Sequence, residues 1–410
     1  MYITEKNLFK IALFFNSIYI FLFFLFSPQG ISVSKILITS FLLFSFVVFV
    51  FLSLRNKKSL NDIPYLAKYA FYLLMFWGIV TVSRGFSLSI QDWVTNLGNV
   101  YMGLAWLMPI LILLGHKIEY WNIIIKVIFT IFKLLIVSFL IVYFSMNLSV
   151  EYSWLLRPVC FLILIGLYRY KLINKIIIFL ILTIYLITAI KVDIRVDFMY
   201  LFLVFSFILI DSIKQIKIKR SFLKYILFSF IILLCIVFTV GYETLSNFVA
   251  QIIDFQDSRT FLFQELFQEL SPIEKIFGRG SLGTYYSHYF EHTKWYIVEI
   301  LHRPWWGDSS TRITTEVGYL QMILKGGLIM LILNLFLMTY ATYLALFKSN
   351  NRFVKRLGFY ILILIILSLI SFRPAFIPTF IILWIAIGTV LSKKNRQMGN
   401  EEIENLIKFK

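Results

Sequence analysis

The sequence predicts an all-α fold, a polytopic membrane bundle in which most of the chain is transmembrane helix. Of the 410 residues, 60% are hydrophobic and the mean hydropathy is +0.86, which is too apolar for a soluble globular protein. Apolar runs of about 20 residues, the length needed to cross a bilayer, follow one another along the chain. One long polar and aromatic stretch, residues 243–315, interrupts them. We expect a single membrane domain, 1–410, with that stretch as a large loop.

Counting on this basis gives about twelve transmembrane helices, several of them short enough to be tilted or bent. In chain order the expected spans are Leu8–Phe26, Ile36–Leu54, Leu66–Val82, Asn96–Leu114, Ile123–Met146, Trp154–Tyr168, Ile176–Ile190, Phe198–Ile210, Tyr225–Tyr242, Glu316–Phe347, Leu357–Phe372 and Ala375–Leu391.

The positions of the basic residues predict the topology, because Lys and Arg accumulate in cytoplasmic loops. The net charge is +18, and with the N-terminus inside, 25 of the 39 basic residues fall on the cytoplasmic side. The short loops on the other side hold only Lys35, Arg84, Arg157, Lys191, Arg195 and Arg373. Both termini are then cytoplasmic and loop 243–315 lies outside. The charge needs no nucleic-acid partner to explain it.

Other features of the chain are structural. Cys160 and Cys235 lie within apolar runs, which predicts core residues and no disulfide. The first span follows a basic start but lacks a small-x-small cleavage site after it, so we expect an uncleaved helix. The tail, residues 393–410, is expected to form a short amphipathic or frayed cytoplasmic helix.

The outer loop is too long and too rich in aromatic residues for an ordinary connection or a disordered one. Leu262, Leu266 and Leu270 recur at i and i+4, which predicts an amphipathic helix on the membrane surface or on the bundle. Ser271-Pro272 should end it. Gly278, Arg279, Gly280 and Gly283 then indicate a tight turn where the backbone can approach a ligand or another helix.

Two arginines near the outer membrane surface are candidates for function, because charge at that position is expensive. Arg195 lies in a very short loop, where its guanidinium could bind phosphate in bidentate fashion. Pairing with Asp193 or Asp197 at the interface explains it equally well. Arg259 stands near the start of the amphipathic helix and could bind an anion there. A surface ion pair is the simpler explanation for Arg259.

Glu316 is the third candidate, since it opens the tenth expected span after Thr314 or Thr315 as N-cap. Interaction of its carboxylate with the helix dipole is a sufficient account. The functional alternative is a general base that takes a proton from a sugar hydroxyl in a partly dry cavity. Gly326 and Gly327 would allow close helix packing further along the span.

Three of the four histidines, His288, His292 and His302, lie in the loop among many Tyr and Trp residues. Aromatic residues near a membrane usually form an interfacial belt, and the alternative is a platform on which sugar rings stack. His288 and His292 are spaced i, i+4, but no third ligand follows in pattern, so no metal is expected.

With these residues in view, the whole chain resembles the O-antigen polymerase and O-antigen ligase superfamily of bacterial envelope glycosyltransferases, which implies a GT-C-like helix bundle. The resemblance rests on the helix count, the single large loop late in the chain, and three local patterns. Ile194-Arg195 is similar to the family's Ser-Arg site, without the serine. Ser258-Arg259-Thr260, followed by the glycine turn at Gly278–Gly283, is similar to the arginine and glycine stretch of the periplasmic loop.

The third pattern separates the two activities of the superfamily. Glu316–Leu320 followed by Gly326-Gly327 is similar to the start of a family helix at which ligases typically show His-Asn. Since Glu316 stands where a ligase has histidine, the resemblance favours a polymerase over a ligase.

The resemblance implies transfer of a growing glycan from undecaprenyl diphosphate to another lipid-linked repeat unit, at the periplasmic face of a bacterial inner membrane. Arg195 and Arg259 would hold the diphosphate and Glu316 would activate the acceptor hydroxyl, with no metal and no cofactor. Membrane lipid and a chain-length regulator protein are the partners implied. Further residues expected to contact substrate are Arg279, His288, His292, His302, Arg312 and Tyr319.

Two alternatives stay open. One is an O-antigen ligase of the same fold. The other, from a different class, is a lipid-linked oligosaccharide flippase or transporter, a class often built from two repeated halves with a site at the midplane. Here the halves differ and the ionisable residues cluster at the outer face.

Overall fold

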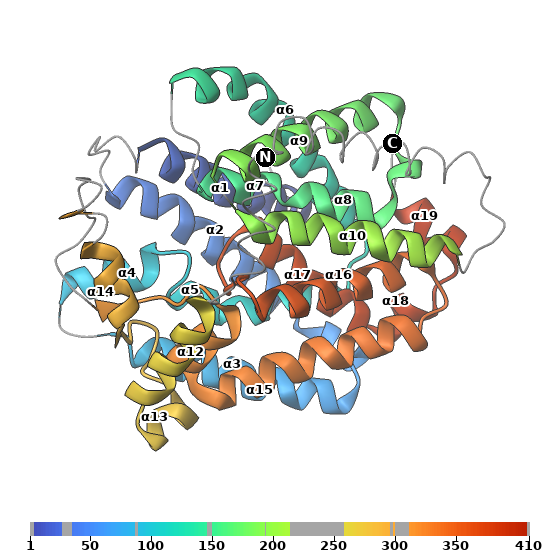
Figure 1. The fold of residues 1–410 in the computed structure, drawn as a ribbon. Helices are drawn as coiled ribbons and strands as arrows, with labels where there is room; N and C mark the ends of the chain where they lie inside the picture. Colours follow the sequence, from blue (N-terminus) through green and yellow to red (C-terminus); the bar gives the residue numbers. More distant parts are fainter. Residues whose placement is uncertain are drawn as a thin grey trace.

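The computed structural model describes residues 4–26, 35–86, 89–145, 150–192, 194–213, 258–295, 298–299 and 311–407. Within these residues the protein is almost entirely helical, with one two-stranded antiparallel sheet. Figure 1 shows the long helices packed as a bundle, with α12, α13 and α14 at one end and α18 and α19 at the other. We call these the loop end and the tail end.

The long helices are α1 (Glu5–Phe26), α2 (Lys35–Arg55), α3 (Tyr65–Ser83), α6 (Glu119–Ser145), α9 (Leu172–Lys191), α10 (Arg195–Ile213), α15 (Gly318–Phe347), α16 (Arg352–Ser368) and α17 (Pro378–Leu391). The shorter elements are η1 (Lys57–Asp62), α4 (Ile90–Gly98), α5 (Gly103–Leu107), η2 (Met108–Leu114), α7 (Val150–Leu156), α8 (Pro158–Gly166), η3 (Leu167–Arg169), α12 (Ser258–Glu269), α13 (Pro272–Phe277), β1 (Tyr285–Tyr286), α14 (His288–Trp295), β2 (Thr311–Arg312), α18 (Lys393–Gln397) and α19 (Asn400–Leu406).

Seven of the described helices are long and apolar enough to cross a membrane, or eight if the pair formed by α4 and α5–η2, bent by 51°, is one span. Helix occupies most of each expected range except Tyr225–Tyr242, which lies outside the described residues, and the expected count of twelve spans is not confirmed. An all-α membrane bundle is therefore confirmed. Some expected spans are short, however. The 14 residues of α17 extend over only about 21 Å, against a hydrocarbon thickness of about 30 Å.

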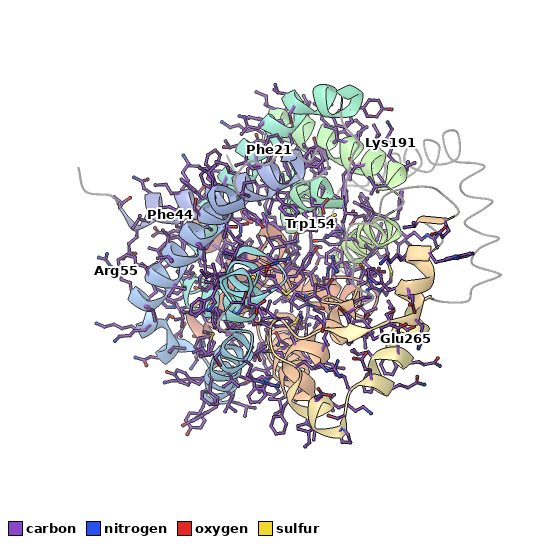
Figure 2. All side chains as sticks on the ribbon, turned by 90° about the vertical axis from the view of Figure 1, so that its left-hand side faces the viewer. Phe21, Phe44, Arg55, Trp154, Lys191 and Glu265 are labelled. Atoms are coloured by element: carbon purple, nitrogen blue, oxygen red, sulfur yellow. The ribbon has the colours of Figure 1, made fainter. Side chains whose placement is uncertain are left out.

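The burial pattern is that of a protein whose solvent is lipid. Trp154 lies in the interior, whereas Phe44 and Arg55 point outward (Figure 2). Many large apolar side chains on the long helices stay exposed, among them Val47 and Val137 at 62% and 75%. Contiguous exposed apolar faces of this kind are rare on soluble monomers and normal where acyl chains cover them.

The basic segments assigned to the cytoplasm meet at the tail end. Glu5 at the start of α1 accepts from Arg55 at 2.7 Å and from Lys117 at 2.5 Å. Arg169 before α9 pairs with Glu404 of α19 at 2.7 Å. Segments that the charge distribution grouped together are thus in direct contact.

The C-terminal tail is ordered against the bundle in its described part. It forms α18 and α19, and Ile403 and Ile407 are buried. The Asn395 side chain donates to the carbonyl of Gly115 at 3.2 Å. The tail is therefore two docked helices rather than one frayed helix.

At the loop end, α12 packs on the bundle. Its Leu262, Leu266 and Leu270 form one apolar cluster with Leu320 and Leu324 of α15. The amphipathic helix predicted here is confirmed, and its apolar face is covered by protein.

Ser271 has a second role beyond following α12. It is the N-cap of α13, and its hydroxyl accepts from the Glu274 amide while the Glu274 carboxylate accepts from the Ser271 amide. This reciprocal capping box, with Pro272 at the first helical position, starts a new helix immediately after the first ends.

The glycine turn joins the loop to the bundle. α15 is broken at Gly327, whose φ is +70°. The freed carbonyls of Leu324 and Lys325 accept from the amides of Arg279 and Gly280 at 2.8 and 2.9 Å. A Cβ on Gly327 would lie 2.0 Å from the carbonyl oxygen of Ile276. The close approach predicted from the glycines is thus to a broken helix.

α3 completes this joint. Arg84 donates from its two Nη atoms to the carbonyls of Phe277 and Gly278 at 2.7 and 2.6 Å. Trp77 donates from Nε1 to the carbonyl of Gly326 at 2.6 Å. The loop is therefore fixed to two spans by backbone groups that have no other helical partner.

Candidate functional site

Three segments between helices meet at the loop end and bring two arginines together. They are the bend between α4 and α5, the junction of α7 and α8, and the extended segment between α16 and α17. We call the residues gathered there, Tyr101, Arg157, Asp197, Phe372 and Arg373, the arginine site. Non-helical backbone at membrane depth occurs where protein or a polar cavity surrounds it, and discontinuous helices of this kind often form binding sites.

Arg157 is held by an acidic partner on α10. Its Nε donates to Oδ1 of Asp197 at 2.9 Å, with the two side chains 9% and 0% exposed. The guanidinium also lies over the Phe372 ring, 4.5 Å from its centroid. Within the described part of the chain, Oδ2 of Asp197 has no hydrogen-bond partner. Tyr185 lies beside the pair and interacts electrostatically with Asp197, and burial makes such a pair expensive for a purely structural role.

Arg373 connects this pair to the large loop. Its guanidinium stacks on Tyr101 at 3.8 Å from the ring centroid. Nη1 donates to the Thr314 hydroxyl at 3.1 Å and to the Thr315 carbonyl at 3.4 Å. Tyr101 also interacts electrostatically with Arg157. Both guanidinium groups therefore act on one small region with aromatic walls.

Such a region suits an anionic group. Two planar guanidinium groups lie here beside the buried carboxylate of Asp197, and Glu151 also interacts electrostatically with Tyr101. Guanidinium binds phosphate oxygens in bidentate fashion, and exclusion of water strengthens that interaction. The aromatic rings beside the arginines supply the apolar surface on which a sugar or lipid part can rest.

Arg195 lies next to this site along the chain. It is the first residue of α10, its side chain is exposed, and it precedes Asp197 by two residues in the same turn. Asp197, one of the two partners considered for Arg195, pairs with Arg157. The other, Asp193, lies outside the described residues.

Arg259 is the second residue of α12, and its side chain lies outside the described part of the structure. The helix itself packs on α15 through its leucines. Arg259 is therefore placed by its backbone in the first turn of a helix at the loop end.

Glu316 lies just before α15 and not in its first turn. The helix begins at Gly318, with Val317 as N-cap and no side-chain cap. The reason is local, because the Thr315 hydroxyl donates to the Val317 carbonyl and the Thr315 amide donates to Oε1 of Gln321. These bonds keep residues 315–317 out of the helix.

The surroundings of Glu316 are also wetter than predicted. Its carboxylate accepts from Nη2 of Arg312 at 3.1 Å, and its side chain is 56% exposed. A partly dry cavity is therefore wrong for this carboxylate. Glu316 directly follows Thr314 and Thr315, the two loop residues that Arg373 contacts, while its own carboxylate is bonded to Arg312.

Arg312 and Tyr319 have structural contacts. Arg312 is on β2, pairs in register with Tyr285 of β1, and lies over the Phe290 ring at 4.9 Å. The Tyr319 hydroxyl donates to the carbonyl of Ile365 on α16 at 3.2 Å.

Arg279 organises the loop. Its Nε and Nη atoms donate to Oε1 of Glu274 at 3.0 Å, Oε1 of Glu269 at 2.6 Å and the carbonyl of Thr284 at 2.7 Å. Donation by Arg279, together with the Ser271 amide, lowers the pKa of Glu274 to about 2. A guanidinium engaged on three sides holds the loop together and has little left to offer a substrate.

The loop histidines fall mostly outside the described side chains. His288 is exposed at the start of α14, with its ring edge-on to Tyr286 at 4.8 Å. The side chain of His292 and all of His302 lie outside the described residues. Among the residues that are described, no group of three or more His, Cys, Asp or Glu could hold a metal ion.

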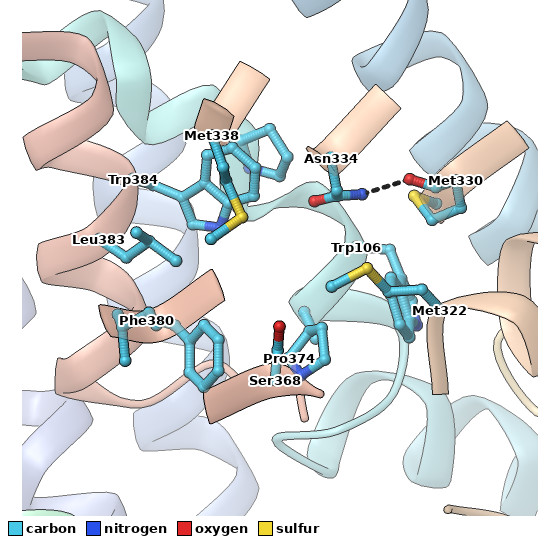
Figure 3. A pocket seen from close by; sticks show the side chains of 13 residues that line it. Trp106, Met322, Met330, Asn334, Met338, Ser368, Pro374, Phe380, Leu383 and Trp384 are labelled. Atoms are coloured by element: carbon cyan, nitrogen blue, oxygen red, sulfur yellow. Dashed lines mark hydrogen bonds between the residues drawn. The ribbon is translucent and has the colours of Figure 1, made fainter. Parts of the chain in front are cut away.

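A small cavity lies beside α15, α16 and α17 (Figure 3). It is lined mainly by apolar side chains, among them Trp106, Met322 and Trp384, and Asn334 there donates to the carbonyl of Met330 at 2.8 Å. Its volume of about 20 Å³ holds about one water molecule, so it is a packing gap and not a sugar site.

The sequence interpretation missed the central residues of the arginine site. The charge assignment counts Arg157 with the short outer loops, although it falls within the expected span Trp154–Tyr168, where an ionisable residue is a functional candidate by default. That rule would have selected Arg157. Nothing in the sequence indicates that its partner is Asp197 or that Arg373 lies against Tyr101, since both contacts join distant helices.

Comparisons with protein-family models, with curated proteins and with solved structures found no match to this chain.

Proposed function

We propose that this protein is a polyprenyl-diphosphate-dependent glycosyltransferase of the O-antigen polymerase type. It extends a surface glycan by transferring the chain from undecaprenyl diphosphate to another lipid-linked repeat unit at the outer face of the plasma membrane. The proposal joins the sequence resemblance to one structural observation, the two arginines Arg157 and Arg373 beside the loop residues that lead to Glu316.

The arrangement supports a division of labour. Arg157 and Arg373, with Arg195 and Arg259 added from the ends of α10 and α12, supply positive charge for the diphosphate. Charge on that group grows as the bond between the anomeric carbon and the phosphate oxygen breaks, and preorganised donors aimed at developing charge are the largest catalytic term available.

Glu316 acts on the acceptor. Its carboxylate takes the proton from the attacking sugar hydroxyl as the new glycosidic bond forms, and the electron pair of the broken bond leaves with the diphosphate. The hydrogen bond from Arg312 fixes the position of one oxygen of the carboxylate. Its exposed remainder stays accessible to an acceptor arriving from the loop side.

The charge distribution supports an outer location for this chemistry. The arginine site and the loop lie at the end of the bundle opposite the contacts of Glu5 with Arg55 and Lys117. The tail end gathers the basic segments expected in the cytoplasm. If the tail end lies in the cytoplasm, the loop end faces outward, which in a bacterium is toward the periplasm.

Loss of the gene separates this proposal from its rivals. A polymerase mutant displays surface polysaccharide with a single repeat. A ligase mutant accumulates polymer on undecaprenyl diphosphate, and a flippase mutant traps single units inside the cell. A gel of surface polysaccharide combined with analysis of lipid-linked intermediates distinguishes the three, and either of the last two patterns rejects the polymerase assignment.

Single substitutions test the site. Glu316→Gln should leave the protein in the membrane and abolish chain extension, while Glu299→Gln, an exposed glutamate of the same loop, should retain wild-type chain lengths. Arg373→Ala should lower the transfer rate by about 10²-fold or more if it contacts the leaving diphosphate. Wild-type chain lengths with Glu316→Gln would reject the general-base assignment.

A further inference from the structure

A large groove at the tail end has no role in the proposed transfer reaction. It has a volume of about 810 Å³ and is open to the outside of the bundle. α1, α6 and the start of α9 form its walls, and α19 reaches its rim through Asn405 and Leu406. We call it the lysine groove, after Lys6, Lys10, Lys126 and Lys133, which line it.

The three helices around the groove all begin at this end. Lys6 of α1 pairs with Glu119 at the start of α6, and Arg169, just before α9, pairs with Glu404 of the tail. Figure 1 shows α1, α6 and α9 together along one side of the bundle. Helix N-termini carry partial positive charge, so three parallel starts add to the charge of the lysines.

The lysines of the groove are poorly neutralised. Glu119 is the one acidic residue in the lining, and it pairs with Lys6. Among the described residues, Lys10, Lys126 and Lys133 form no ion pair with an acidic side chain. Long side chains on a helix lean toward its N-terminus, so Lys126 and Lys133, two turns apart on α6, both lean toward the mouth of the groove.

The neighbouring groove shows the difference. It is lined by Glu5, Lys6, Lys117, Glu119 and Lys394 among others, and both of its carboxylates pair with lysines of the same lining, Glu5 with Lys117 and Glu119 with Lys6. The described lining of the lysine groove has four lysines against one carboxylate, whereas that of the neighbouring groove has three lysines against two carboxylates.

Apolar surface surrounds the charge. Ile123 and Phe129 line the groove, and next to its lining residues the side chains of Leu134, Ile173 and Ile176 are 56%, 70% and 50% exposed. A free phosphate ion would make no favourable contact with this apolar surface. An occupant with an anionic head and acyl chains matches both parts, because lysines stay by the head while their stems and the isoleucines lie along the chains.

We propose that the lysine groove is a binding site for an anionic phospholipid of the leaflet that contains the protein's N-terminus. The lipid phosphate sits among Lys10, Lys126 and Lys133, with the Asn122 amide of the same lining as a hydrogen-bond donor, and the acyl chains pack along α6 and α9. The site lies at the opposite end of the bundle from the arginine site and is independent of the reaction proposed there.

The test measures lipid selectivity of the full-length protein. Wild-type protein and variants are reconstituted in nanodiscs of phosphatidylcholine with a minor fraction of phosphatidylglycerol. Retained lipids are then counted by native mass spectrometry. Lys10→Gln/Lys126→Gln/Lys133→Gln removes three charges from the groove. Lys57→Gln/Lys58→Gln/Lys68→Gln removes three from η1 and α3 at the same end, outside the groove.

Wild type and the control triple should retain phosphatidylglycerol in preference to phosphatidylcholine. The groove triple should lose that preference by about fivefold for each lysine removed. Both triples alter exposed or half-exposed side chains, and equal unfolding temperatures in pure phosphatidylcholine confirm that each is folded.

Three outcomes would overturn the proposal. They are no preference in the wild type, an equal loss in both triples, and displacement of the retained lipid by millimolar inorganic phosphate, which would indicate a site for the free ion.

Discussion

At the scale of single residues, the arginine site depends on a buried ion pair that a bundle does not need for stability. Arg157 and Asp197 join α8 and α10, where two well-packed apolar side chains would serve equally well. An anion that shares Arg157 would explain why the pair is present.

Removing one partner of this pair should be more harmful than removing both. Arg157→Met leaves Asp197 buried and uncompensated, and should lower the free energy of unfolding by about 3–5 kcal/mol. Arg157→Met/Asp197→Leu should recover most of that loss while remaining inactive. Thermal unfolding in detergent measures both, and a double variant no more stable than the single one would contradict this account.

The Arg279 network should make the loop sensitive to acid. The folded pKa of Glu274 is about 2, below its ordinary 4.5, so protonation opposes folding. Its stabilising contribution is therefore complete above about pH 4.5 and is lost as the pH falls from 4.5 toward 2. The unfolding temperature of wild type should approach that of Glu274→Gln over this window, and a constant difference between the two would refute the assignment.

Residue types could be chosen from the sequence more readily than their partners. Arg195 and Glu316 were selected because charge near a membrane is costly, and the structure places both beside the segments that form the arginine site. Asp197 was considered only as a neighbour of Arg195. Its partner Arg157 is 40 residues away, and a packing contact of that kind leaves no pattern in either local sequence.

At the scale of elements, the broken helix α15 fixes the loop. Its ladder is interrupted at Gly327, and the carbonyls released there accept from the glycine turn. Only glycine fits, because φ is positive and the Ile276 carbonyl is in contact.

Gly327→Ala should therefore detach the loop. The added methyl would lie 2.0 Å from a carbonyl oxygen, and strain of this kind costs about 1–3 kcal/mol or more. Trypsin should then cut at Arg279, whose amide is bonded to the Leu324 carbonyl of α15 in the wild type. Gly399→Ala is the matched control, since nothing lies within 4 Å of the added atom. Equal protection of Arg279 in both variants would rule out the joint as the anchor.

Helices were predictable because lipid forces every spanning backbone group to bond within its own helix, which leaves long apolar runs in the sequence. The residues at which the helices begin and end were harder to predict. The start of α15 moved from Glu316 to Gly318 because Gln321 and Thr315 bond across the boundary. Ser271 was predicted to end α12, and it is also the N-cap of α13.

At the scale of the whole molecule, the bundle has two chemically distinct ends. The distribution of basic residues assigned the N-terminus, Arg55 and Lys117 to one side of the membrane. In the structure Glu5, near the N-terminus, contacts both Arg55 and Lys117. The distribution of charge does not indicate which loops meet at the loop end. The meeting of Tyr101 with Arg373 depends on how α5 and α17 pack, and hydropathy does not encode this.

The orientation of these ends in the membrane is testable. In a Cys160→Ala/Cys235→Ala background, His288→Cys at the loop end should react with a membrane-impermeant maleimide added to spheroplasts. Lys57→Cys at the tail end should react only after lysis; both wild-type side chains are exposed. Labelling of Lys57→Cys in sealed spheroplasts would reverse the topology and remove the outward-facing site.

The joint between α3, the glycine turn and α15 also bears on how the chain is made. Trp77 and Gly326 are separated by 249 positions, so α3 leaves the ribosome long before its partner exists. The indole N–H of Trp77 and the amides of Arg279 and Gly280 have no partner until Leu324–Gly327 has been inserted. Assembly of the loop end would therefore be a late, post-insertion event, and nascent chains halted before that glycine should be preferred clients of membrane proteases.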